Sequence, residues 1–337
     1  MSNRNPTAFL RAHGWENAAR SNIAGDASNR RYDRLTRSDG RRAILMDAPP
    51  DMGEDVRPFI AITDLLRAQN LSAPRIFGAD TEAGFLLLED LGDNLFASAI
   101  AADPSLEQPL YAAATDVLIH MHCAPPPKLP AYDAVTMTPL AGLAFEWYGS
   151  GALSRSLTEP QLAFQVACHA ALEPLDTQLT ALIQRDYHAE NLLWLPDREG
   201  IARVGLLDYQ DAMRGHPAYD LVSILQDARR DITPDIAQEM ITRYVTQTDT
   251  DHDTFETAYA LLGMQRSMRI LGVFARLSLA FGKPQYVDLI PRVWGHLTTN
   301  LQHPALATLS PLITDILPEP SADVLNTLRD KCASMAL

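Results

Sequence analysis

The sequence predicts an α+β fold with two lobes, a small β-rich N-terminal lobe over residues 1–92 and a larger, mainly helical C-terminal lobe over residues 93–337. Two runs of strand-forming residues flank an Asp-Gly dipeptide at residues 39–40, which is a strong hairpin signal. The aliphatic run GFLLLEDLG, residues 84–92, is typical of a buried strand. Apolar residues then recur at helical spacing, as in residues 105–122. A cleft between the two lobes is therefore the expected ligand site.

The N-terminal lobe is expected to contain one sheet and two helices. A short helix is predicted over residues 6–13, and strands are predicted within residues 21–37 and 41–50. Residues 55–69 carry apolar side chains at helical spacing, so a second helix follows the hairpin. The strand GFLLLEDLG then ends in an acidic turn and closes the lobe.

The C-terminal lobe is expected to be helical with one short interruption. A proline-stiffened connector, CAPPPKLPAYD, follows the first long helix. Further helices are predicted over residues 139–148 and 159–182 and again from residue 219 onward. Between them, residues 192–209 form a short β region.

Composition excludes several classes of protein. The chain has 337 residues, of which 47% are hydrophobic, and this is enough for a sizeable core rather than a disordered chain. Its net charge of −14 argues against a nucleic-acid partner. Its three cysteines are isolated, which fits a reducing compartment, and neither a signal peptide nor a membrane span is recognisable. We expect a cytoplasmic monomer with a small-molecule substrate and no membrane partner.

Three oxygen-bearing side chains form the candidate chemical site. Asp186 and Asn191 lie five residues apart in the loop RDYHAEN, between two aliphatic runs. Asp208 ends the aliphatic run VGLLD, where a strand would deliver its carboxylate. In protein kinases an Asp accepts the substrate proton, an Asn five residues later binds metal, and a strand-end Asp binds metal. The spacing therefore predicts Mg²⁺-dependent phosphoryl transfer, whereas a solvated turn is the alternative.

The segments RDYHAENLL, LLDYQDA and GHPAYDLVSIL resemble the aminoglycoside phosphotransferase and choline kinase family. This resemblance covers residues 20–285 and implies a protein-kinase-like fold with ATP as phosphoryl donor. It implies that Asp186 is the catalytic base and that Asn191 and Asp208 bind Mg²⁺. It also implies that Asp220 orders the catalytic loop.

The resemblance also implies a nucleotide site in the N-terminal lobe. The segment GDASNRRY resembles the loop that covers the phosphates, and the turn after GFLLL resembles the hinge that meets adenine. The nucleotide-binding candidates are Ser28, Asn29, Arg30, Arg31, Met46, Glu89, Asp90 and Leu91.

Two positions depart from the family pattern. Gln184 stands where the family often has His. Met46 stands where a phosphate-binding Lys is expected, and no lysine occurs in residues 1–127. A closed cleft still needs a cation for the phosphates. Arg30 or Arg31 is the candidate, with Arg41 and Arg42 behind them, and an exposed pair on an edge strand is the alternative interpretation of Arg30 and Arg31.

A narrower resemblance indicates the substrate. RRYDR, ILMDAPP, RDYHAENLLWLP and MQRSMRILGVFARL are similar to a branch that phosphorylates the anomeric hydroxyl of N-acetylmuramic acid and N-acetylglucosamine in cell-wall recycling. The lysine-less strand is also similar to that branch. An arginine in MQRSMR is expected to meet the lactyl carboxylate of muramic acid. The candidate sugar-binding residues are Glu146, Trp147, Tyr148, Asp211, Gln265, Arg266 and Arg269.

Alternative interpretations stay open at this point. Trp147 and Tyr148 could be core residues, and Asp211 could be solvated or pair within its loop. A kinase for an aminoglycoside, choline or homoserine is the first alternative function. A catalytically inactive kinase-like binding protein is the second, and its only support is the missing lysine. The anomer, the choice between ATP and GTP, and the oligomeric state are left undetermined.

Overall fold

The structure is a computed structural model that describes residues 4–23, 29–125 and 128–334. It divides into two compact units. The sheet unit comprises Met1–Val117 with Ala189–Ala212, and the helical unit comprises Leu118–His188 with Met213–Leu337. These units do not coincide with a division at residue 92, because 93–117 and 189–212 group with the sheet. The expected lobe boundary stays a prediction.

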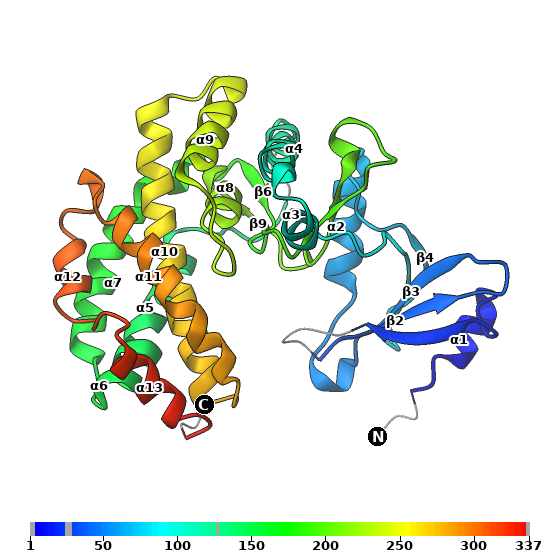
Figure 1. The fold of residues 1–337 in the computed structure, drawn as a ribbon, viewed down its shortest axis with the longest axis horizontal. Helices are drawn as coiled ribbons and strands as arrows, with labels where there is room; N and C mark the ends of the chain where they lie inside the picture. The colour runs from blue at the N-terminus through cyan, green and yellow to red at the C-terminus, as the bar shows by residue number, and fades with distance from the viewer. Residues whose placement is uncertain (1–3, 24–28, 126–127, 335–337) are drawn as a thin grey trace. The chain divides into compact units, whose positions relative to one another are not determined.

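The sheet unit is built on a five-stranded antiparallel sheet in the order β1-β2-β3-β5-β4 (Figure 1). The Asp-Gly turn joins β2 to β3 in register, so that Tyr32 pairs with Met46 and Arg34 with Ile44. The strands are β1 Ala19–Ile23, β2 Arg31–Thr36, β3 Arg42–Asp47, β4 Ile76–Asp80 and β5 Phe85–Glu89.

The two faces of this sheet have different roles, because successive side chains on a strand point to opposite faces. Leu35, Leu45 and Leu87 lie on one face and form a buried cluster with Phe9 and Trp15 from the N-terminal segment. Alternate positions of the same strands, such as Tyr32 and Met46, point to the opposite face. That second face is the one that lines a pocket.

The remaining elements of the sheet unit are helices and one small two-stranded sheet. Helix α2 has a proline at its second position, which favours a helix start, and an amphipathic pattern. Its apolar residues Phe59, Ile62 and Leu66 are buried. The elements are α1 Thr7–Ala12, α2 Arg57–Ala68, α3 Phe96–Ala102, and the antiparallel pair β7 Leu192–Trp194 and β8 Val204–Leu206. Helix α4, Glu107–His122, begins in this unit and ends in the helical unit.

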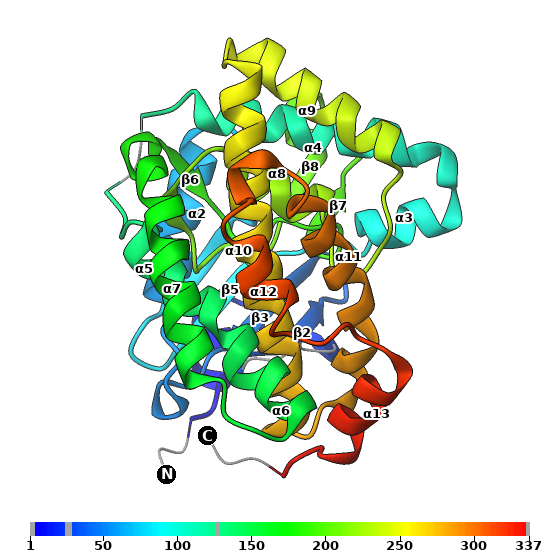
Figure 2. The same cartoon turned by 90° about the vertical axis from the view of Figure 1, so that its left-hand side faces the viewer.

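The helical unit is organised around α10, His252–Leu279 (Figure 2). Asp251 caps this helix by accepting a hydrogen bond from the Thr254 amide. Gly272 permits close contact with the end of α5, Ala134–Leu143, since a Cβ there would lie 2.3 Å from the backbone of Leu143. The other helices are α5 Ala134–Leu143, α6 Ser150–Leu153, α7 Thr158–Leu172, α8 Ala218–Leu225, α9 Pro234–Thr248, α11 Ile290–Asn300, α12 Ser310–Thr314 and α13 Ala322–Asp330.

The α+β architecture, with one sheet-bearing and one mainly helical unit, confirms the expected fold class. Several local predictions were wrong. The helix expected over 159–182 ends at Leu172, because Pro174 lies in the first turn of a short 3-10 helix, Glu173–Gln178, and β6, Ala181–Ile183, pairs with β9, Met213–Gly215. The single strand expected within residues 21–37 overlaps two strands, β1 and β2, and β4 was not anticipated. The expected helix over 139–148 begins earlier, at Ala134, and continues as a π-helix, Ala144–Gly149.

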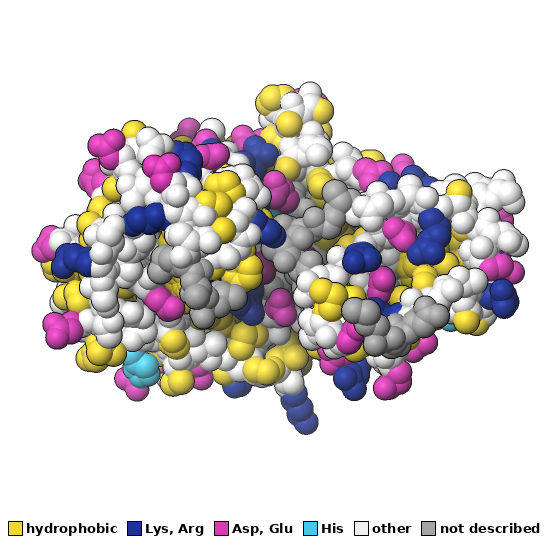
Figure 3. All heavy atoms as spheres, turned by 90° about the horizontal axis from the view of Figure 1, so that it is seen from below, with side chains coloured by type: hydrophobic (Ala, Val, Ile, Leu, Met, Phe, Trp, Pro, Cys, Tyr) yellow, Lys and Arg dark blue, Asp and Glu magenta, His cyan; other side chains and the backbone are white. Residues whose placement is uncertain are grey.

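The surface carries charges of both signs. On the face drawn in Figure 3, basic and acidic side chains are interspersed among polar and apolar ones. Within the part of the chain that the structure describes, no helix is long and apolar enough to cross a membrane.

Candidate functional site: a pocket in the sheet unit and a charged loop in the helical unit

The sheet unit contains a pocket of about 490 Å³ whose lining residues all belong to that unit. Its apolar walls come from the second face of the sheet, from α2 and from the β7–β8 pair. They comprise Ile23, Ile44, Met46, Phe59, Pro74, Leu88, Leu91, Leu95, Leu193 and Leu207. Volume and apolar lining of this kind are typical of a small-molecule site.

The charged lining of the pocket is acidic. Two arginines, Arg30 and Arg34, face five carboxylates: Glu89, Asp90, Asp93, Asp208 and Asp211. A polyanionic ligand would therefore need an accompanying cation to enter this pocket favourably.

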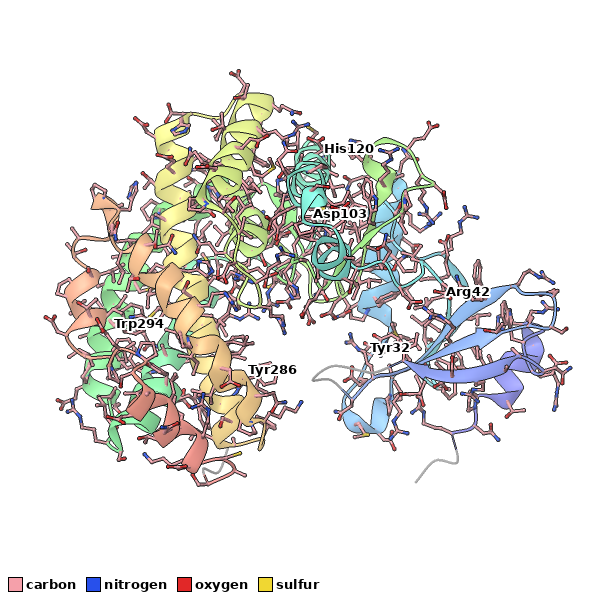
Figure 4. The ribbon with its side chains drawn as sticks, viewed as in Figure 1. Tyr32, Arg42, Asp103, His120, Tyr286 and Trp294 are labelled. Atoms are coloured by element: carbon pink, nitrogen blue, oxygen red, sulfur yellow. The ribbon has the colours of Figure 1, made fainter. Side chains whose placement is uncertain are left out.

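Met46 occupies the expected lysine position and is buried in the pocket wall. Tyr32, which is labelled in Figure 4, is its partner across the hairpin and lines the pocket from the same face of the sheet. Burial raises the pKa of Tyr32 to about 12, although Arg30 lowers it, so the hydroxyl keeps its proton at neutral pH. At this place the sheet offers a thioether and a phenol instead of an ammonium group.

The structure distinguishes Arg30 from Arg31. Arg30 lines the pocket, and its Nε lies 2.8 Å from Oε2 of Glu54 in a mostly buried ion pair. Burial would lower the pKa of Arg30, but the charges of Tyr32 and Glu54 raise it, so the guanidinium stays charged. Arg31 is exposed and does not line the pocket, which follows from the alternation of side chains along the strand.

The other arginines behind this hairpin are engaged elsewhere. Arg41 is exposed and lies 2.7 Å from Asp39 in the turn. Arg42, labelled in Figure 4, is half-exposed and lies 3.4 Å from Asp90.

The end of β5 carries the residues predicted to form the hinge. Glu89 pairs with Arg198 at 2.8 Å, and its backbone N–H donates to the Arg75 carbonyl at 2.8 Å. Asp90 is almost completely buried and lies 2.8 Å from Nε of Arg34. Arg34 thus ties β2 to the strand end. Leu91, next in the chain, lines the pocket.

Asn191 and Asp208 lie side by side along one edge of the pocket. Asn191 precedes β7 and Asp208 follows β8, and the Leu207 amide donates to the Asn191 carbonyl at 3.0 Å. Asp208 adopts a left-handed backbone conformation, with φ at 56°, which ends the strand and turns the chain. Gln210 donates to Oδ1 of Asp208 at 2.8 Å.

Tyr209 fixes the segment after Asp208 to α2. Its ring stacks on Phe59 at a centroid distance of 5.0 Å, and its hydroxyl lies 2.8 Å from Oγ1 of Thr63. Because Tyr209 and Thr63 are both buried, this contact fixes the strand end relative to the helix.

The donor set at this edge fits a hard divalent cation. Asn191 and Asp208 supply amide and carboxylate oxygens, and the buried Oε1 of Gln210, which also lines the pocket, has no hydrogen-bond partner in the structure. Mg²⁺ prefers such oxygens together with phosphate oxygens and water. Within the described ranges, three or more His, Cys, Asp or Glu side chains nowhere gather as a complete metal cage, so a ligand would have to complete the coordination.

In the helical unit, the loop after β6 is held by a buried carboxylate. Asp220 accepts hydrogen bonds from the backbone N–H groups of Gln184 at 2.6 Å and Arg185 at 2.9 Å. Burial raises the pKa of Asp220 to about 7, even though these two N–H groups favour its ionised form. Arg185 has φ at 73°, a strained conformation that Asp220 and Ser223 stabilise through its N–H and carbonyl. Asp220 therefore shapes the backbone that leads into Asp186.

Aromatic and basic side chains of the helical unit surround this loop. The Arg185 guanidinium lies over the Tyr132 ring at 5.2 Å, and the Tyr132 and Tyr219 rings meet edge to face at 5.0 Å. Arg269 donates to the Tyr219 hydroxyl at 3.3 Å. Burial would lower the pKa of Arg269, but Tyr219, Tyr132 and Asp186 raise it, so Arg269 is a half-buried permanent cation within electrostatic reach of Asp186.

The other predicted sugar-binding residues fall into different environments. Tyr148 is buried and donates to the Pro318 carbonyl at 2.6 Å, and Trp147 is also buried, which matches their interpretation as core residues. Gln265 is fully buried and donates to the Met137 carbonyl, and Arg266 is buried and donates to the Gln226 carbonyl. Glu146 is exposed.

Asp211 is exposed and lines the pocket of the sheet unit, so the structure groups it with the nucleotide candidates. Asn29 is not among the residues that line that pocket; its backbone N–H donates to Glu54 at 3.1 Å. Ser28 lies outside the described residues. Because Asp186 and the pocket belong to different units, the expected convergence of Asp186 with Asn191 and Asp208 stays a prediction.

Sequence reasoning missed Tyr32, Arg34 and Glu54. The hairpin register about residues 39–40 could have placed Tyr32 opposite Met46, and period-two alternation could have grouped it with Arg30 and Arg34. No sequence signal links Glu54 to Arg30, because the pair closes a loop between two different elements.

Comparisons with known proteins identify the family of this chain. A family model described as the phosphotransferase enzyme family matches residues 20–255. An N-acetylmuramate/N-acetylglucosamine kinase of Caulobacter vibrioides is 39% identical over 90% of this chain and 93% of its own length. A kinase of the same name from Pseudomonas putida is 32% identical over 87% of both chains.

A solved choline kinase of Streptococcus pneumoniae has a TM-score of 0.59 at 14% identity and covers 87% of this chain and 98% of its own. At that identity the likeness concerns the fold alone. The expected kinase-like fold is thereby confirmed.

Proposed function

This chain belongs to the phosphotransferase enzyme family, and from that premise we propose that it transfers the γ-phosphoryl group of ATP to the anomeric hydroxyl of N-acetylmuramic acid or N-acetylglucosamine. The observation that carries this proposal is the 39% identity to a kinase named for these sugars, over nine-tenths of the chain. The oxygen donors Asn191 and Asp208, side by side on an acidic pocket, support the choice of reaction.

The pocket of the sheet unit is proposed to hold the nucleotide. Its apolar walls suit the adenine ring, and the backbone at Glu89–Leu91 would supply the polar contacts to the edge of the ring. Arg30 would meet the phosphates, because it is charged and lines the pocket on the same face as Tyr32 and Met46. Arg31 has no such role, because it lies on the other face of β2.

Asn191 and Asp208 would hold Mg²⁺ at the edge of this pocket. The bound ion would supply neutralisation of the charge on the phosphates and of the charge that develops during transfer. An acidic pocket without such an ion would repel ATP, so the sign of the lining charge itself supports a cation requirement.

Asp186 is proposed to accept the proton of the anomeric hydroxyl. As that O–H bond breaks, the sugar oxygen forms a bond to the γ-phosphorus, and the bond from this phosphorus to the β–γ bridging oxygen breaks to release ADP. Asp220 would contribute by fixing the backbone at Gln184 and Arg185, which sets the direction of Asp186. Most of the acceleration would come from positioning and charge neutralisation.

Arg269 is the best-placed cation for the acceptor in the helical unit. It is the half-buried member of the MQRSMR segment, whereas Arg266 is buried and bonded to a carbonyl group. A guanidinium can bind a carboxylate with two parallel hydrogen bonds, which suits the lactyl group of N-acetylmuramic acid.

A substrate panel with Mg-ATP tests the proposal. We expect ADP release with N-acetylmuramic acid and N-acetylglucosamine and none with kanamycin, choline or homoserine. The reducing end of the sugar is expected to disappear in step with ADP release, because an anomeric phosphate blocks ring opening. Turnover of kanamycin, choline or homoserine alone would support the alternative acceptors. Nucleotide binding without turnover of any acceptor would support an inactive binding protein.

A further inference from the structure

Glu54, just before α2, uses both of its carboxylate oxygens in contacts with the segment that precedes β2. Oε2 lies 2.8 Å from Nε of Arg30, and Oε1 accepts the backbone N–H of Asn29 at 3.1 Å. The Glu54 side chain is 12% exposed and that of Arg30 is 13% exposed. The attraction within a charge pair so shielded from water is screened less than that within a surface ion pair, and one carboxylate here contacts both a side chain and the backbone beside it.

The ion pair of Arg30 and Glu54 lies at the wall of the pocket, because Arg30 is one of the lining residues. Arg30 precedes β2 and lines the pocket on the same face as Tyr32 and Met46. The wall at Met46 offers no cation of its own. A cation delivered from the neighbouring strand can serve this wall only if something fixes its direction, since an arginine side chain otherwise samples many rotamers.

Glu54 is itself attached to a fixed element. It lies just before α2, and α2 is joined to the segment after Asp208 through the contacts of Tyr209 with Phe59 and Thr63. The chain of contacts therefore runs from Arg30 through Glu54 and α2 to the strand end that carries Asp208. Arg30 and Asp208 line the same pocket, and contacts with α2 or with the segment just before it hold both of them in place.

We propose that Glu54 is a positioning residue for nucleotide binding. It holds the Arg30 guanidinium at the pocket wall beside Met46, and through α2 it fixes the position of this guanidinium relative to Asp208. The inference rests on the proposed function only in taking the pocket as the nucleotide site. The ligand class it concerns is a nucleoside polyphosphate, and Glu54 does not touch the reacting atoms.

The test compares Glu54→Gln with Asp55→Asn, its matched control. Asp55 is the adjacent acidic residue; it pairs with exposed Arg57, and neither side chain lines the pocket. Binding of Mg-ADP is measured calorimetrically without any sugar, and the KM values for ATP and sugar are measured separately. We expect Glu54→Gln to weaken Mg-ADP binding and raise the KM for ATP by about tenfold, with the KM for sugar unchanged. Asp55→Asn is expected to stay within about twofold of the parent protein.

A double-mutant cycle separates positioning from simple structural support. If Glu54 acts through Arg30, then adding Glu54→Gln to Arg30→Gln causes no further loss of Mg-ADP affinity. Additive losses, or a fall in Tm in Glu54→Gln without a change in nucleotide affinity, would overturn the inference. Tighter binding in Glu54→Gln would also overturn it, because it would mean that Glu54 merely neutralises Arg30.

The outcomes distinguish this inference from the proposed function. Failure of every sugar to be phosphorylated, with Mg-ADP affinity still dependent on Glu54, refutes the sugar kinase and supports the positioning role. Sugar turnover with an unchanged nucleotide affinity in Glu54→Gln refutes the positioning role alone. A parent protein that binds no Mg-ADP contradicts both.

Discussion

The sheet unit and the helical unit hold their functional charges in different ways. Around the pocket, charges pair side chain to side chain, as Arg30 does with Glu54 and Arg34 with Asp90. Around the loop of Asp186, Asp220 is fully buried and is satisfied by backbone N–H groups. A guanidinium has five N–H donors and can bind a ligand while it keeps its carboxylate partner, whereas a backbone-bonded buried carboxylate cannot move without distorting the chain. The comparison teaches that the pocket is built to bind a charged ligand and the loop to keep one geometry.

The largest effect is expected at Asp208. Asp208→Ala removes the carboxylate at the edge of the pocket, so Mg²⁺-dependent turnover is expected to fall below detection with the Tm nearly unchanged. Activity is measured across a range of Mg²⁺ concentrations, with Asp211→Asn as a comparison from the same segment. Normal activity of Asp208→Ala at low Mg²⁺ would contradict the assignment of Asp208 to the metal.

Asp186→Asn tests whether the helical unit contributes chemistry rather than nucleotide binding. Losing the proton acceptor is expected to lower kcat by about 10²-fold or more. Mg-ADP affinity, measured by calorimetry, is expected to stay at its parental value because Asp186 does not line the pocket. An Asp186→Asn variant with parental kcat would show that Asp186 is not the proton acceptor.

Arg30→Ala and Arg31→Ala test whether two adjacent arginines differ in function because their side chains lie on opposite faces of the sheet. Arg30→Ala is expected to raise the KM for ATP by at least about tenfold, because a charge-assisted contact with the phosphates is lost. Arg31→Ala is expected to leave both KM and kcat within about twofold. The reverse ranking would mean that the hairpin register does not describe the nucleotide-bound protein.

Arg269→Gln tests whether Arg269 contributes to the binding of only one of the two proposed sugars. N-acetylmuramic acid carries a lactyl carboxylate that N-acetylglucosamine lacks, so the variant is expected to raise the KM for the first sugar by about tenfold and leave the second unchanged. The pair of substrates is its own control, because a general folding defect would affect both sugars. Equal losses for the two would exclude Arg269 as the carboxylate partner.

Asp220→Asn is expected to change how the stability of the protein depends on pH. The pKa of Asp220 is raised from 3.8 to about 7 on folding, so the folded state binds this proton more tightly than the unfolded state. Its contribution to the free energy of unfolding is fully present below about pH 4 and is lost as pH rises through about 7, with a slope of at most about 1.4 kcal/mol per pH unit.

Urea unfolding at several pH values between 4 and 8 measures this slope, which Asp220→Asn is expected to remove. Asp253→Asn, at a fully exposed position, is the control and is expected to keep the parental slope. A parental slope in Asp220→Asn would show that another group titrates.

The sequence by itself determined the fold class, the hairpin of β2 and β3, the strand that ends at Glu89, and the placement of Asp208 after a short strand. These features are local, because turn chemistry and hydrophobic periodicity act over a few residues. The order of the motifs also determined the family.

Only the tertiary structure decided which face of the sheet lines the pocket, and hence that Arg30 rather than Arg31 borders it. Alternation separates the two side chains, but the packing of the N-terminal segment on the other face selects the side that stays open. The same holds for Tyr148, whose hydroxyl bonds to the distant Pro318 carbonyl, and for Glu54, whose partner lies in another element. Contacts between residues distant in sequence depend on the packing of whole elements, and local patterns do not encode that packing.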